Sequence, residues 1–95
     1  MAVGPVILTI HPEPAKQGVY IDRGKYEAMR RTILAKLKRY GRLTFKQLGD
    51  LVANELHATF TSSVQWYYAT VKLDLEARGE LKRVPNSRPQ LIELA

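Results

Sequence analysis

The feature that most constrains the fold is one stretch, residues 61–84, which reads TSSVQWYYATVKLDLEARGELKRV. It predicts a long helix, a stop and the first strand of a hairpin. Ser62 is placed to cap the helix. The side chain of Gln65, three residues later, can accept a hydrogen bond from the backbone amide of Ser62. Gly79 supplies the left-handed residue at which helices commonly end.

Apolar residues fall on two opposite sides of this predicted helix, at about 100° per residue. One stripe comprises Val64, Tyr68, Val71 and Leu75, and the opposite side carries Trp66, Leu73 and Ala77. A helix with apolar stripes on two sides must be covered from two sides. The rest of the chain therefore has to supply two covering surfaces.

The N-terminal segment of the chain predicts a hairpin. Residues 6–10, VILTI, form a strand in which Val6, Leu8 and Ile10 share a face. The following HPEPAKQG contains two prolines and a glycine, which break the strand, and residues 19–21 form a second one. We expect the hairpin over residues 5–21 to cover the second side of the long helix. The side chains it would cover are Trp66 and Leu73.

A helix is predicted over residues 23–40, with Asp22 as its N-cap and Gly41 at its end. Its core face comprises Tyr26, Met29, Ile33, Leu37 and Tyr40.

After a short strand at Leu43, Thr44 and Gln47 form a capping box for a helix over residues 45–56. Gly49 weakens this helix slightly relative to alanine, which suggests close packing at that position. Its inward-facing residues are Phe45, Leu48, Leu51, Val52 and Leu56.

The basic charge is concentrated in one segment. The chain has 15 Lys and Arg against 9 Asp and Glu, a net charge of +6. Residues 23–46 hold nine bases and one acid, whereas residues 1–22 and 47–95 each have a net charge of −1. Such a concentration favours a polyanionic partner, either nucleic acid or an acidic protein.

Other classes of protein have little support in the sequence. There is no cysteine, which excludes disulfide scaffolds and thiolate metal sites. No apolar run is long enough for a membrane span, so we expect a soluble cytoplasmic protein without a membrane partner. The histidines His11 and His57 lie in predicted loops without metal-ligand spacing, and we expect no enzyme activity, no metal and no cofactor.

Residues 81–84, LKRV, and 90–94, QLIEL, predict a terminal hairpin. Helix, short strand, helix, helix and hairpin is the order found in the winged helix-turn-helix. The resemblance covers residues 25–94 and rests on LTFKQLGDLV and on VKLDLEARGELKRV, where the third helix ends in Leu-Glu-x-x-Gly before a basic strand. KYEAMR, Trp66 and TVKLDLEARG are also similar to a small group of uncharacterised bacterial winged-helix proteins, which implies no established activity.

The resemblance implies an α+β fold with three helices, a C-terminal β-hairpin wing and an added N-terminal β-hairpin. Residues 1–22 would be an extension packed on a winged-helix domain of residues 23–95, giving one domain overall. It further implies a DNA-binding regulator whose third helix enters the major groove. Its base-edge contacts would be Ser62, Ser63, Gln65, Ala69 and Lys72, and its wing would place Lys82, Arg83 and Arg88 on phosphates.

The helix over residues 23–40 carries the densest charge. Arg31, Lys38 and Arg39 face away from its core side, and Arg42 and Lys46 continue the patch. These residues predict a platform for the phosphates of DNA or RNA, and an ordinary solvated helix face remains the alternative.

The alternative function is a winged-helix module for protein–protein contact without DNA readout, including a homodimer. In that case an uncovered Trp66 would be the anchor. Exposed residues at 62, 63, 65 and 69 beside a basic wing favour DNA, whereas an uncovered apolar patch at 66 and 73 favours a protein partner.

Overall fold

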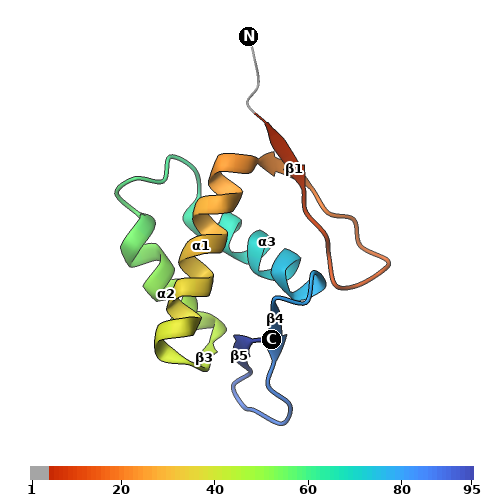
Figure 1. The fold of residues 1–95 in the computed structure, drawn as a ribbon, viewed down its shortest axis with the longest axis vertical. Helices are drawn as coiled ribbons and strands as arrows, with labels where there is room; N and C mark the ends of the chain where they lie inside the picture. The colour runs from red at the N-terminus through yellow and green to blue at the C-terminus, as the bar shows by residue number, and fades with distance from the viewer. Residues whose placement is uncertain (1–4) are drawn as a thin grey trace.

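The computed structural model describes residues 5–95, so the first four residues of the predicted extension lie outside the described part. The chain is α+β, with three helices and two small antiparallel sheets (Figure 1). In chain order the elements are β1 (Val6–Leu8), β2 (Tyr20–Asp22), α1 (Arg23–Tyr40), β3 (Leu43–Thr44), α2 (Phe45–Leu56), α3 (Val64–Ala77), β4 (Leu81–Arg83) and β5 (Leu91–Leu94).

The two sheets lie at opposite ends of α1 (Figure 1). One sheet is the hairpin of β1 and β2, in which Ile7 pairs with Ile21. The other has the strand order β3-β5-β4, so the short strand between α1 and α2 pairs with the last strand of the chain. This layout is compatible with a winged helix.

The helix caps of α1 and α2 follow the sequence prediction. The Asp22 carboxylate accepts a hydrogen bond from the Lys25 amide at 2.8 Å, and Gly41 ends α1 with φ of 80°. At α2, the Thr44 hydroxyl accepts from the Gln47 amide while the Gln47 side chain accepts from the Thr44 amide, as a capping box requires.

The start of α3 corrects the sequence prediction by one residue. Ser63, not Ser62, is the N-cap, and its hydroxyl accepts a hydrogen bond from the Trp66 amide at 3.1 Å. The end is as predicted, because Gly79 has φ of 78°.

The core lies between the three helices and the β3-β5-β4 sheet. The predicted stripe of α3 is its centre, with Val71 and Leu75 fully buried. Two predicted core residues are instead near the surface, since Tyr40 is 49% and Phe45 46% exposed. Both lie at a helix end, where the neighbouring elements no longer cover the apolar face.

The N-terminal hairpin turns its other face inward. Ile7 packs against the core and Ile21 is buried. Residues 6, 8 and 10 do share one face, as the alternation predicts. That face points to solvent, and Val6, Leu8 and Ile10 are each 45–47% exposed.

A buried carboxylate joins this hairpin to α1 and α3. Asp74 of α3 is fully buried and accepts hydrogen bonds from the Ile10 amide at 2.8 Å, from the Tyr26 hydroxyl and from Arg78 Nε at 2.9 Å. Arg78 also donates to the carbonyl of Leu8. The hairpin is therefore attached near the C-terminal half of α3, and the expectation that it covers Trp66 is wrong, since Trp66 is 48% exposed.

Candidate nucleic-acid interface

The serines at the start of α3 are occupied by bonds within the chain. The Ser62 hydroxyl accepts a hydrogen bond from Lys25 Nζ, on α1. The Ser63 hydroxyl is the helix cap. Of the five residues expected at base edges, Gln65 is exposed and Ala69 partly exposed, both beside a hollow between α2 and α3.

Lys72 is nearly buried and does not project from the helix as a base contact would. Its side chain is only 8% exposed, as is that of Glu76, with which it forms an ion pair one helical turn later. Its ammonium also lies 5.7 Å from the centre of the Phe45 ring. Lys72 could reach a base edge only by leaving a nearly buried acid, which is costly.

Glu76 also holds one of the residues expected to contact phosphate. Arg83 Nε of β4 lies 3.3 Å from a Glu76 carboxylate oxygen. The Arg83 guanidinium is therefore directed at α3. Lys72, Glu76 and Arg83 form one cluster with a net charge of +1.

Ion pairs with acids outside this segment reduce the charge of residues 23–46. Four of the nine bases are paired: Arg30 with Glu80, Lys36 with Glu55, Arg42 with Glu93 and Lys46 with Asp50. The hydrogen bond from Lys36 lowers the pKa of Glu55, and the bond to Asp50 raises the pKa of Lys46. Within residues 5–95, the exposed side chains of Arg31, Lys38 and Arg39 form no ion pair.

A row of charged residues crosses the outer face of the β3-β5-β4 sheet. Glu93 of β5 sits between Arg42, whose Nε is 3.0 Å away, and Lys82 of β4, whose Nζ is 3.7 Å away. The two basic side chains are 59% and 58% exposed, whereas Glu93 is 22% exposed. Lys38 joins this row, because it lines a shallow hollow of about 390 Å³ together with Arg42 and Glu93.

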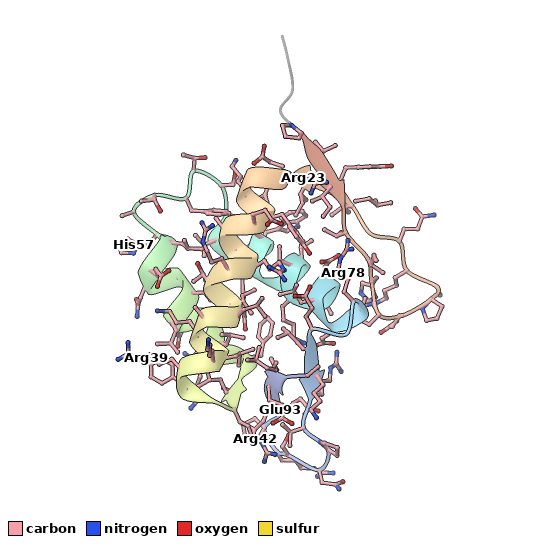
Figure 2. All side chains as sticks on the ribbon, viewed as in Figure 1. Arg23, Arg39, Arg42, His57, Arg78 and Glu93 are labelled. Atoms are coloured by element: carbon pink, nitrogen blue, oxygen red, sulfur yellow. The ribbon has the colours of Figure 1, made fainter. Side chains whose placement is uncertain are left out.

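We call this surface the basic end of the molecule. Figure 2 shows Arg39, Arg42 and Glu93 at the end of the molecule opposite Arg23, and the loop between β4 and β5 extends from the same end in Figure 1. That loop carries Arg88, which is exposed and forms no ion pair with any described residue. The bases of the basic end are Lys38, Arg39, Arg42, Lys82 and Arg88.

The hollow between α2 and α3 differs in character. Its volume is about 300 Å³, and its lining is mainly apolar, with Lys46 and Asp50 among its residues. The Tyr68 hydroxyl donates to the carbonyl of Phe45 at 2.6 Å, and burial raises the pKa of Tyr68. This hollow has the chemistry of a packing surface and not of a phosphate site.

The side of α3 away from the core is apolar. Trp66 is half exposed and Leu73 partly exposed, and neither belongs to the core cluster. We call this surface the α3 outer face, and its residues are Trp66, Ala69, Thr70, Leu73 and Ala77. Sequence periodicity places both large residues on this side of the helix. It does not show that the tryptophan is left half exposed by the rest of the described chain.

Nothing in the described part of the chain groups three or more potential metal ligands. His57 Nδ1 lies 3.0 Å from the carbonyl of Asn54, and His11 Nδ1 accepts a hydrogen bond from the Glu13 amide. No helix within residues 5–95 is long and apolar enough to cross a membrane.

Comparison with known proteins places the chain in a family without assigning it an activity. The model of a family of unknown function, DUF6958, matches residues 6–92, so the chain belongs to this family. No curated protein and no solved structure matches it.

Proposed function

We propose that this member of DUF6958 is a winged-helix protein that binds duplex nucleic acid through the phosphate backbone, using its basic end. The observation that carries the proposal is the Arg42–Glu93–Lys82 row together with Lys38 and the loop residue Arg88. DNA is the expected duplex, and RNA and an acidic protein are the other polyanions that this surface suits.

The geometry of the row suits the binding of a phosphate group better than unconnected surface charges would. Glu93 accepts from Arg42 only at Nε, which leaves the terminal guanidinium nitrogens to donate elsewhere. The same acid lies beside Lys82, so one partly buried carboxylate of β5 orients two exposed cations, Arg42 just before β3 and Lys82 on β4. Arginine and lysine held in this way are the usual partners of phosphate oxygens.

Direct base readout has much weaker support. Specific contacts in the major groove come from Arg, Lys, Asn or Gln side chains that reach base edges. Lys72 of α3 is buried and the two serines just before the helix are bonded within the chain, which leaves Gln65 as the exposed side chain of this kind. We therefore propose binding that positions the protein on a duplex without selecting a sequence, so a regulator role would need a second component.

Fluorescence anisotropy with labelled duplexes of several sequences tests the proposal. Binding should weaken as salt rises, with a slope that reports the number of neutralised phosphates. Replacing Arg88 or Lys38 by alanine should each reduce the slope by about 1. The matched controls are Arg23→Ala and Lys16→Ala, which remove the same charge from exposed residues outside the basic end and should leave the slope unchanged.

Four outcomes would contradict the proposal. Absence of binding at low salt would exclude a nucleic-acid partner for this surface. Equal losses in the basic-end variants and their controls would show that net charge, and not this surface, drives binding. A preference of more than about tenfold among duplex sequences, abolished by Gln65→Ala, would show that α3 reads bases after all. Tighter binding to single-stranded RNA than to duplex would move the function to RNA.

A further inference from the structure

Tyr40 is an aromatic side chain that lies outside the core of the protein. It is the last residue of α1, it is 49% exposed, and it is not part of the hydrophobic core. In the described part of the chain, Phe45 packs against Tyr68 and Trp66 against Tyr67, whereas no aromatic pair includes Tyr40. The exposed part of its ring is therefore open to a binding partner.

The surroundings of this ring are cationic. The guanidinium carbon of Arg39 lies 5.4 Å from the centre of the Tyr40 ring, which is within the range of a cation–π contact. Lys38 and Arg42 lie two positions before and after Tyr40 in the chain. Figure 2 shows Arg39 and Arg42 at the same end of the molecule. The ring is therefore part of the basic end, whose cations are the proposed phosphate contacts.

An exposed aromatic ring among cations matches a polyanion that also offers planar groups. Nucleobases stack on aromatic rings and on guanidinium planes, while basic side chains bind the phosphates beside them. Inside a continuous duplex each base is covered by its neighbours in the stack, so a protein meets only base edges and the backbone. A ring such as that of Tyr40 reaches the face of a base only where the duplex ends or a strand is unpaired. One phenol ring covers about one base and not a whole base pair, which favours an unpaired base.

We propose that Tyr40 and Arg39 form a stacking site for an unpaired base, and that the basic end binds DNA where a duplex continues into a single-stranded extension. The inference rests on the proposed function, because Lys38, Arg42 and the other cations of the basic end hold the phosphates of the adjoining duplex. Stacking accepts any base, since every base has a π-face. The site therefore selects the form of the nucleic acid and not its sequence, in keeping with the scarcity of base-reading side chains on α3.

Fluorescence anisotropy with three DNA ligands built on the same labelled duplex tests the inference. The first ligand is blunt-ended, the second carries a short single-stranded extension, and the third carries an abasic extension of the same length. The two extensions have equal numbers of phosphates, so the difference between their affinities measures the contribution of the bases. The full chain should bind the base-bearing extension at least about fivefold more tightly than the abasic one, as expected for one stacked base.

Substitutions at the stacking site separate the ring from the charge. Tyr40→Ala should remove the difference between the two extensions and leave the salt slope on the blunt duplex unchanged, because it removes no charge. Tyr40→Phe should retain the difference, since phenylalanine keeps the ring. Arg39→Lys should reduce the difference at an unchanged salt slope, because lysine keeps the charge without the plane. Trp66→Ala is the matched control, since it removes an aromatic side chain that is 48% exposed and lies outside the basic end, and it should change neither quantity.

The outcomes distinguish this inference from the proposed function. Absence of binding to all three ligands at low salt would overturn the proposed function and the stacking site with it. Salt-dependent binding of the blunt duplex, with equal affinities for the two extensions, would overturn the stacking site alone. Equal losses of affinity for the blunt and the extended duplex in Tyr40→Ala would place the ring against the duplex itself. Loss of the difference in Trp66→Ala would place base stacking on the α3 outer face instead.

Discussion

Replacement of Asp74 by asparagine should destabilise the protein strongly, although it exchanges only one oxygen for an NH2 group. The carboxylate is fully buried and joins three segments: the hairpin through the Ile10 amide, α1 through Tyr26, and the end of α3 through Arg78. Asparagine has nearly the same shape, so the substitution removes charge and one acceptor without creating a cavity.

The magnitude follows from the bonds that asparagine cannot make. One oxygen can still accept from the Ile10 amide and from Arg78 Nε at 3.0 Å. The new NH2 group accepts from neither Tyr26 nor Arg78, so the bond from Tyr26, the second bond from Arg78 and the charge opposite Arg78 are lost. Hydrogen bonds to charged groups contribute about 1.5–3 kcal/mol each. Arg78 is 32% exposed and can be partly solvated by water, so we expect a loss of about 3 kcal/mol, at the lower end for a broken buried pair. For a chain of this size that corresponds to roughly 12–24 °C in Tm.

Urea denaturation followed by circular dichroism measures this loss. Asp50→Asn is the control, because that acid is 65% exposed and paired with a lysine that is 85% exposed, and it should cost less than about 1 kcal/mol. Equal effects of the two substitutions would refute the view that Asp74 fastens the hairpin to the helices. Amide hydrogen exchange should also show faster exchange at Ile10 in Asp74→Asn only.

Two further substitutions test the packing and the titration of the core. Gly49→Ala should cost about 1–3 kcal/mol, because a Cβ there would lie 2.8 Å from Cε2 of Tyr68, and a neutral result in thermal unfolding would contradict that close contact. Burial, and then the bond to Asp74, raise the pKa of Tyr26, so its contribution to stability is complete below the unfolded pKa near 10 and is lost as pH rises above it. Tyr26→Phe should therefore lose stability less steeply than the wild type in alkaline urea titrations, and parallel curves would exclude this linkage.

Local signals in the sequence were sufficient for most of the secondary structure. The caps at Asp22 and Thr44 and the left-handed Gly79 each depend on residues within a few positions, so the sequence predicts them without tertiary information. At the start of α3, two adjacent serines satisfy the same local rule. The choice between them depends on Lys25 of α1, which binds Ser62, and no local pattern contains that contact.

The face of the N-terminal hairpin could not be chosen from alternation alone. Period two separates Val6 and Leu8 from Ile7, but both sets are apolar. The structure places Ile7 inward, where it packs against the core together with Ile21. The outcome depends on attachment at Asp74, which lies 64 residues from Ile10 in the chain.

The candidate site was only partly predictable for the same reason. The sequence shows which residues are basic, and the basic end includes five of those expected to contact nucleic acid. It does not show that bases of residues 23–46 form ion pairs with acids elsewhere in the chain, namely Glu80, Glu55 and Glu93. Nor does it show that Lys72 is enclosed between Glu76 and Phe45.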